Sequence, residues 1–132
     1  MGDLLIVDDD VDTAELLGEA LALGGHRVRI AHDGMVGLRE LSVRMPDAVL
    51  LDVEMPNLDG PGMALQMFVR NCGLERIPII LLSGVLDLER VAARVGTPYF
   101  LSKPYALGAV RALCDRALAE RTPPAPVLDG ST

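Results

Sequence analysis

Carboxylates follow two short apolar segments of this sequence, and their types and positions could do chemistry. Asp8 and Asp9 come directly after the apolar run at residues 4–7, and Asp52 comes directly after the run at residues 48–51. Two unit charges roughly 4 Å apart repel by about 4 kcal/mol at an effective dielectric of about 20, so clustered carboxylates need protonation or a cation. A small set of carboxylate oxygens favours Mg²⁺, which keeps some of its waters and then takes phosphate oxygens.

A hydroxyl and an ammonium end two further apolar runs. Ser83 follows the run at residues 77–82, and Lys103 lies just beyond the run at 99–101. Lys103 is the only lysine in the chain, and an ammonium acts as a point charge that arginine replaces poorly. Carboxylates for a metal, a lysine and a hydroxyl together favour a phosphoryl group as the ligand. Asp52 would then either bind the metal or accept the phosphoryl group as a nucleophile.

The elements that must position these side chains alternate between strands and helices. Short apolar runs predict five strands, at residues 4–7, 26–31, 48–51, 77–82 and 99–101. Apolar residues at helical spacing lie between and after them, in stripes that begin at Leu16, Met63 and Leu107 and in shorter segments at 36–41 and 88–95. Five β-α units predict an α/β fold with a parallel sheet and helices on both faces. Ligands of such sheets bind at the carboxyl ends of the strands, which is where the candidate residues fall.

Composition limits the classes of function. The chain has 132 residues, 50% of them hydrophobic, which fits one globular domain. Its net charge of −7 argues against nucleic acid as a direct ligand, because phosphate neutralisation needs a basic face. No apolar run reaches the roughly 18 residues needed to span a membrane, and the N-terminus lacks the basic region of a secretory signal. We therefore expect a cytoplasmic protein with no membrane contact.

Two features lie outside the predicted site. Residues 1–121 are expected to form the domain, and residues 122–132 a flexible tail or the start of a linker, since the Pro-rich segment at 122–126 cannot continue a helix. Cys72 and Cys114 fit neither a zinc pattern nor a disulfide framework. We expect both to be buried free thiols.

Four segments in order along the chain resemble one known family. They are LIVDDD at residues 5–10, LLDVEMPNLDG at 50–60, ILLSG at 80–84 and FLSKP at 100–104. Each is weak alone, but together they resemble the response-regulator receiver domain of two-component signalling, which is CheY-like. The resemblance covers about residues 3–120, nearly the whole domain. The resemblance implies a flavodoxin-like (βα)5 fold with five parallel strands in the order 2-1-3-4-5.

The resemblance also implies roles for the matching residues around a metal ion. Asp52 resembles the phosphoacceptor and a metal ligand. Asp9 resembles the residue that binds Mg²⁺ directly, and Asp8 the residue that acts largely through a water. The backbone carbonyl of Glu54 would be a further ligand, and Mn²⁺ is expected to substitute for Mg²⁺.

Three more residues resemble the part of the family site that binds and senses the phosphoryl group. Ser83 resembles the switch hydroxyl, Lys103 the family's lysine, and Lys103-Pro104 its cis peptide bond. Phe100 resembles the switch aromatic, although a static core residue is an open alternative. The neighbouring Tyr99 cannot supply the phenol that Phe100 lacks, because adjacent strand residues face opposite ways.

The implied function is a switch rather than an enzyme with a separate substrate. A histidine kinase or phosphotransfer protein would phosphorylate Asp52, and the domain would assist its own phosphorylation and dephosphorylation. The face made by the fourth helix, fifth strand and fifth helix would then change protein partners, in a monomer or a phosphorylation-dependent dimer.

Two other functions are alternatives. A receiver-fold interaction module could signal independently of phosphorylation; the stretch between Ser83 and Lys103, which looks slightly short for the family, favours it. A haloacid-dehalogenase-type phosphatase would want a second aspartate two residues after Asp52, where this chain has Glu54. The Glu54 carboxylate is instead a candidate for tuning how fast a phosphoryl group is lost.

Overall fold

Strands and helices alternate along the whole of the domain. The computed structural model describes residues 2–70 and 72–127. In chain order the elements are β1 (Asp3–Val7), α1 (Val11–Leu23), β2 (Arg27–Ala31), α2 (Gly34–Val43), β3 (Ala48–Leu51), α3 (Gly60–Arg70), the 3-10 helix η1 (Leu74–Arg76), β4 (Ile79–Ser83), α4 (Leu88–Val95), β5 (Tyr99–Ser102) and α5 (Leu107–Glu120). All strand pairs are parallel, in the order β2-β1-β3-β4-β5. The predicted α/β fold and strand order are confirmed.

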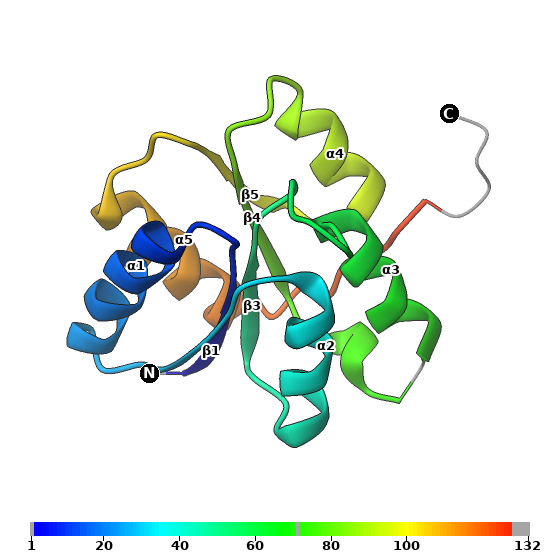
Figure 1. Cartoon of the computed structure of the whole chain (residues 1–132), viewed down its shortest axis with the longest axis horizontal. Coiled ribbons are helices and arrows are strands. Elements are labelled where there is room, and N and C mark those ends of the chain that lie inside the picture. Colours follow the sequence, from blue (N-terminus) through cyan, green and yellow to red (C-terminus); the bar gives the residue numbers. More distant parts are fainter. Residues whose placement is uncertain (1, 71, 128–132) are drawn as a thin grey trace.

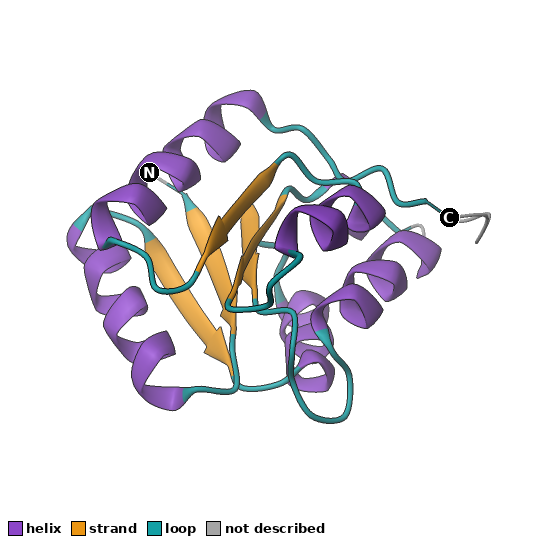
Figure 2. Cartoon of the chain, turned by 90° about the horizontal axis from the view of Figure 1, so that it is seen from above, coloured by secondary structure: helices purple, strands orange, loops and turns teal. Residues whose placement is uncertain are grey.

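The sheet lies between two helical layers. Helices α1 and α5 cover one face, and α2, α3 and α4 cover the other (Figures 1 and 2). β1 shows why, since Leu4 and Ile6 pack with α1 and α5 while Leu5 and Val7 pack with the opposite layer. Successive strand residues face opposite sides, so a strand covered on both sides must be apolar throughout.

Aspartates fix the starts of the first two helices. The Asp10 carboxylate accepts a hydrogen bond from the Thr13 backbone N–H at 3.2 Å, and the Asp33 carboxylate accepts one from Val36 N–H at 2.8 Å. Both bonds satisfy an N–H that the first helical turn leaves without a partner. Asp10 therefore caps α1, and its own backbone N–H donates to Asp8 Oδ1 at 2.9 Å.

Two expectations about burial are wrong. Leu16 is 57% exposed, because α1 buries the stripe formed by Ala14, Leu17 and Leu21, and Leu16 falls outside that stripe. Cys72 is exposed and only Cys114 is buried. Cys72 lies two residues beyond the end of α3.

Strand ends also differ slightly from the sequence pattern. The run at 77–82 predicts a strand there, but β4 is Ile79–Ser83, because η1 precedes it and Pro78 has no N–H to donate. The shift places Ser83 inside the strand. Among the described residues, no helix is both long and apolar enough to cross a lipid bilayer.

The residues beyond α5 contact the domain. Pro124 is buried, and the N–H groups of Ala125 and Val127 donate to the carbonyls of Gly96 and Arg94. The domain boundary at residue 121 stays a prediction. Met1 and residues 128–132 of the expected tail lie outside the described residues.

Candidate functional site

The candidate residues lie at the carboxyl edge of the sheet, because the strands that precede them are parallel and end side by side. The backbone N–H of Asp52 donates to Val7 O at 2.9 Å, and that of Asp8 donates to Ala31 O at 3.0 Å. The N–H of Lys103 likewise donates to Ser83 O at 2.8 Å. Strand-to-strand bonding thus continues one residue past each strand end. The backbone fixes where these side chains begin.

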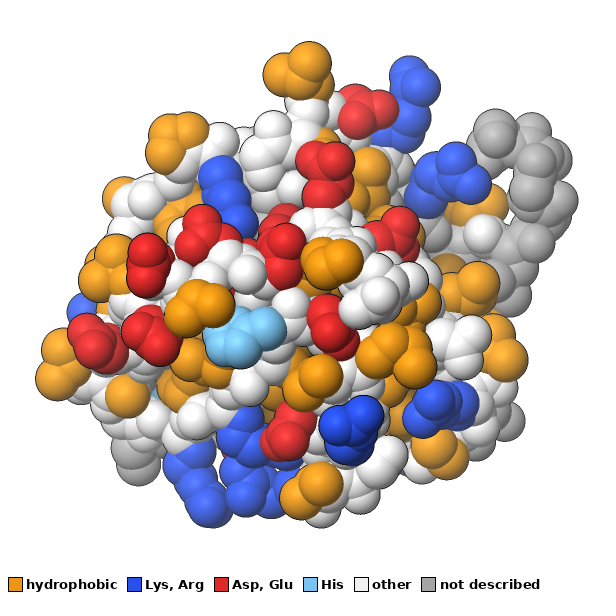
Figure 3. Space-filling model, in the orientation of Figure 1, with side chains coloured by type: hydrophobic (Ala, Val, Ile, Leu, Met, Phe, Trp, Pro, Cys, Tyr) orange, Lys and Arg blue, Asp and Glu red, His pale blue; other side chains and the backbone are white. Residues whose placement is uncertain are grey.

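Three carboxylates converge at this edge. One oxygen from each of Asp8, Asp9 and Asp52 lies within 4.8 Å of the others. Asp8 and Asp52 are buried and Asp9 is exposed. Figure 3 shows acidic side chains gathered near the middle of the visible face, with basic ones mainly toward its edges. Clustered carboxylate oxygens at an accessible edge are the donor set that suits Mg²⁺, so the residues present fit that ion.

Lys103 supplies a positive charge to the same volume. Its Nζ donates to Asp8 Oδ2 at 2.9 Å and lies 3.7 Å from Asp52 Oδ2. Burial acts to lower the pKa of Lys103, but the hydrogen bond to Asp8 and the charge of Asp52 outweigh it and the pKa is raised. The side chain is therefore an ammonium at neutral pH.

Asp52 has one occupied oxygen and one that faces the lysine. Its Oδ1 accepts a hydrogen bond from Val53 N–H at 2.8 Å, and its Oδ2 faces Lys103. Burial raises the pKa of Asp52, and the nearby Asp8 charge adds to this, while Lys103 opposes it. Gly60 lies against the same backbone, where a Cβ atom would overlap Asp52 O.

Ser83 and the residues of β5 complete the edge. Ser83 is buried, and its Oγ accepts a hydrogen bond from Val85 N–H at 3.4 Å. Phe100 packs against the layer that contains α2, α3 and α4, whereas Tyr99 is buried on the opposite side of the sheet. The Lys103–Pro104 peptide bond is cis. The structure therefore brings together the predicted side chains Asp8, Asp9, Asp52, Ser83 and Lys103, whereas Phe100 lies on one face of the sheet. The Glu54 side chain is exposed, and the role of its backbone carbonyl stays a prediction.

Comparison with known proteins gives the family of this fold and site. A model of the response regulator receiver domain matches residues 4–115, a span that includes every candidate residue. The chain belongs to the response regulator receiver domain family. The family assigned by resemblance is confirmed, and it is a family of two-component signalling domains rather than a classical enzyme family.

Relatives of this receiver domain include longer proteins and isolated domains. Response regulator MprA of Mycobacterium avium (strain 104) is 40% identical over 123 residues, which is 92% of this chain and 52% of that protein. The chain thus spans about half the length of the curated relatives it matches. NtrX from Brucella abortus, in complex with ADP, superposes with a TM-score of 0.82 at 29% identity over 91% of this chain and 27% of its own. The signal receiver domain of a histidine kinase from Syntrophus aciditrophicus has the same TM-score at 27% identity over 98% and 99%.

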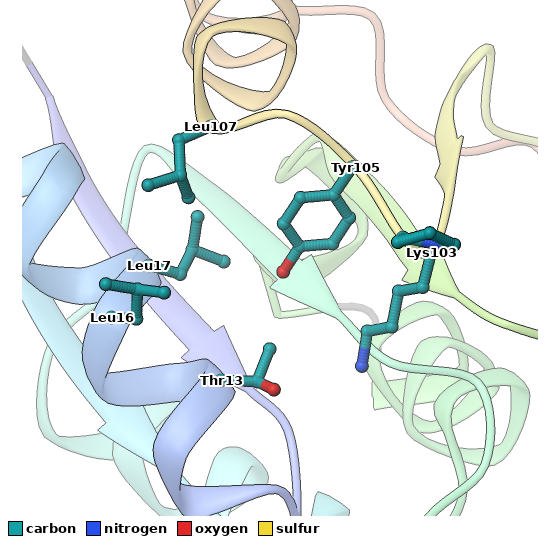
Figure 4. A pocket seen from close by; sticks show the side chains of 7 residues that line it. Thr13, Leu16, Leu17, Lys103, Tyr105 and Leu107 are labelled. Carbon is teal, nitrogen blue, oxygen red and sulfur yellow. The ribbon is translucent and has the colours of Figure 1, made fainter.

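A groove of about 430 Å³ adjoins the site of this receiver domain. It lies between α1 and the start of α5, and its lining residues are Thr13, Leu16, Leu17, Lys103, Pro104, Tyr105 and Leu107 (Figure 4). The Tyr105 hydroxyl is buried and has no hydrogen-bond partner among the described residues, and burial raises the pKa of Tyr105. Sequence reasoning missed Tyr105, since its only signal was its position two residues after Lys103.

Proposed function

We propose that this receiver domain accepts a phosphoryl group on Asp52 and thereby changes its protein contacts. The observation that supports this most is the grouping of Asp8, Asp9 and Asp52 within 4.8 Å, with Lys103 Nζ at 3.7 Å from Asp52. A nucleophilic carboxylate, a metal-binding pair and a fixed ammonium are what phosphoryl transfer needs. The alternative, signalling without phosphorylation, gives no reason to keep all of them together.

The transfer follows from how Asp52 is held. Its Oδ2 attacks the phosphorus of a phosphohistidine, the P–N bond breaks, and the electron pair leaves with the imidazole nitrogen, giving an acyl phosphate on Asp52. The hydrogen bond from Val53 N–H to Oδ1 orients the carboxylate, so that Oδ2 is the attacking oxygen. Lys103 offsets the negative charge of the transferred oxygens.

The metal-binding role falls to the acidic residues of the same edge. Asp8, Asp9 and Asp52 would hold Mg²⁺, or Mn²⁺ in its place, with the backbone carbonyl of Glu54 as a further ligand. A divalent cation bound there would neutralise charge that develops on the phosphoryl oxygens. Asp9 is the exposed member of the three, so its carboxylate would be the one of this set most open to an ion from solvent.

The switch would lie in Ser83 and Phe100. A phosphoryl oxygen on Asp52 offers a new acceptor to the Ser83 hydroxyl, which now accepts a hydrogen bond from Val85 N–H. Movement of Ser83 leaves space that Phe100, only partly buried, can fill. The phosphoryl contacts then shift the population between two packings of the face formed by α4, β5 and α5.

The partners follow from this reaction. A response regulator has a histidine kinase partner in two-component signalling, and here the kinase or a phosphotransfer protein would be the donor. The groove offers a donor protein an apolar surface beside Lys103, whose Nζ lies 3.7 Å from Asp52 Oδ2, and Leu16 on that surface is 57% exposed. The expected downstream partner is a protein that binds the α4-β5-α5 face.

Residues 1–121 form the proposed domain, and its location, oligomeric state and ligands follow from the same function. We propose a cytoplasmic domain that is a monomer or dimerises on phosphorylation, and that acts on no separate substrate. Its net charge of −7 favours protein partners over direct contact with nucleic acid or membrane. This expectation about ligands applies to these 132 residues and not to the part of the curated relatives that the chain does not match.

Phosphorylation by a small donor tests the proposal. The protein is incubated with phosphoramidate and Mg²⁺, and its intact mass is compared with that of Asp52→Asn and of Asp115→Asn, an exposed carboxylate on α5. We expect one added phosphoryl group in wild type and Asp115→Asn only, and none after chelation of Mg²⁺. If wild type gains no mass while a control receiver is modified, the phosphorylation-independent module is favoured instead.

A further inference from the structure

The chain beyond α5 returns to the domain as an extended strap, here defined as residues 122–127. Ala125 N–H donates to Gly96 O at 2.9 Å, and Val127 N–H donates to Arg94 O at 3.0 Å. Donors two residues apart on one edge are the spacing of an extended segment that pairs in the manner of a strand. In Figure 1 the orange-red end of the described chain emerges beside α3 and α4. The strap is therefore held by backbone bonds, which depend little on side-chain identity.

The strap binds where α4 needs partners. The last four backbone carbonyls of a helix accept no hydrogen bond from within the helix. Arg94, whose carbonyl accepts from Val127, is the penultimate residue of α4. Helix α4 has only eight residues, and three of them, Leu88, Ala92 and Val95, are buried. Because α4 buries so few residues, we expect the hydrogen bonds from the strap to contribute much of what fixes its C-terminal end to the domain.

Gly96 makes this approach possible. Its φ of 82° lies in the left-handed region, where it ends α4. A Cβ atom at this position would overlap the backbone of Ala125. Asparagine also tolerates a positive φ and could end the helix, but it could not admit the strap. An asparagine at residue 96 thus separates the two requirements, since it can adopt the positive φ that ends α4 but lacks the space that the strap needs.

Side chains of the strap lie along the groove between α3 and α4. Pro124 is buried. Pro126 and Val127 line a hollow of about 150 Å³ with α3 and α4 residues that include Ala64 and Val95, and Val127 borders a second of about 380 Å³ beside Arg90. The strap therefore contacts two helices of one layer.

We propose that the α3–α4 groove is a docking surface for the chain's own strap, and that docking is coupled to the state of Asp52. The docked strap holds α4 in its present position, and phosphorylation of Asp52 releases it. This rests on the proposed function, in which the face that includes α4 changes on phosphorylation. Coupling is reciprocal, so loss of the strap must favour the phosphorylated form by the same factor.

Amide hydrogen exchange on the full chain tests docking and coupling separately. The N–H groups of Ala125 and Val127 should be protected in the unmodified protein and lose protection when Mg²⁺ and beryllofluoride, a stand-in for the phosphoryl group, are added. Absence of protection in the unmodified protein overturns the strap, whatever Asp52 does. Bound beryllofluoride with unchanged protection overturns the coupling. If calorimetry shows no beryllofluoride binding, the proposed function fails and the coupling with it, while the protection data still decide docking.

Two sets of variants remove the strap from opposite sides. Gly96→Asn excludes it from α4, and Ala125→Pro with Val127→Pro removes both N–H donors without touching the domain. Each should bind beryllofluoride with Mg²⁺ about five-fold more tightly, and the combination should add little, because both break one contact.

Gly73→Asn is the matched control for the glycine substitution. Gly73 also has a positive φ, of 107°, and among the described residues beyond its chain neighbours a Cβ there would meet the flexible Met45 side chain alone. Its affinity for beryllofluoride should equal that of wild type. Wild-type affinity in both Gly96→Asn and the double proline variant would refute the coupling.

Discussion

Lys103 donates a hydrogen bond to Asp8 at 2.9 Å, although the two residues are 95 positions apart. They extend β5 and β1, which are separated in the sheet by β3 and β4. The long side chain reaches along the carboxyl edge past both central strands and also faces Asp52 at 3.7 Å. One ammonium thus links the electrostatics of the metal-binding and phosphoacceptor carboxylates.

Replacing Lys103 by methionine should separate metal binding from phosphoryl transfer. The neutral side chain keeps the length of the lysine but no longer repels a cation held by Asp8. We expect Lys103→Met to bind Mg²⁺ about ten-fold more tightly, yet to react more slowly with phosphoramidate. Isothermal titration and intact-mass time courses measure the two effects. Arg116→Met, on an exposed face of α5, is the control, and equal Mg²⁺ affinities in all three proteins would contradict the argument.

Two glycines near helix starts should respond oppositely to alanine. At Gly60 the added Cβ would overlap Asp52 O, so Gly60→Ala should lower the free energy of unfolding by more than about 2 kcal/mol. At Gly108, in the first turn of α5, no described atom other than its chain neighbours and the nearby backbone of α5 lies within 4 Å of the added Cβ. Gly108→Ala should raise stability by about 0.5 kcal/mol. Urea unfolding followed by circular dichroism decides; equal effects would show that Asp52 O does not restrict Gly60.

The two tyrosines form a second matched pair. Tyr99 Oη donates to Glu120 Oε1 at 2.9 Å, whereas the buried Tyr105 hydroxyl has no partner among the described residues. Tyr99→Phe should therefore lower the free energy of unfolding by about 1 kcal/mol. Tyr105→Phe should leave the free energy of unfolding unchanged or raise it slightly. The substitution removes a buried hydroxyl that has no hydrogen bond, and with it the cost of taking that hydroxyl out of water. A larger loss at Tyr105 than at Tyr99 would indicate that the Tyr105 hydroxyl has a partner in solution.

The two cysteines should differ in reactivity. Cys72 is exposed, while burial raises the pKa of Cys114 to about 12. Because the thiolate is the reactive form, a thiol reagent at pH 8 should modify one site per folded chain and both after unfolding in urea. Peptide mapping of the labelled protein identifies the residue. Rapid labelling of Cys114 in the folded chain would contradict its burial.

The same shift makes stability depend on pH. The unfolded chain releases the Cys114 proton near the ordinary pKa of 9.0, and the folded chain keeps it until about pH 12. The unfolded state therefore binds fewer protons in that window, and the free energy of unfolding falls as pH rises above 9.0. Denaturation curves at pH 8 and pH 10 measure the fall. It should be smaller in Cys114→Ala, and an identical fall in both proteins would assign it to other groups.

Much of the site could be predicted from local sequence because its parts lie at the ends of strands. Apolar runs and helical spacing gave the β-α order, and a parallel sheet brings the carboxyl ends of its strands to one edge. Asp8, Asp52, Ser83 and Lys103 each follow or end such a run. Residue type and position therefore sufficed to group them, even where a strand boundary such as that of β4 was off by two residues at its start.

What only the tertiary structure decided are the contacts between segments far apart in sequence. The exposure of Leu16, the unpartnered hydroxyl of Tyr105, and the return of Ala125 to Gly96 depend on which surfaces meet, and no local pattern records that. The sequence by itself determined the fold class, the family and the grouping of charged residues at the sheet edge. Distances such as 2.9 Å from Lys103 to Asp8 needed the packed chain, because side-chain reach depends on strand order and twist as well as residue type.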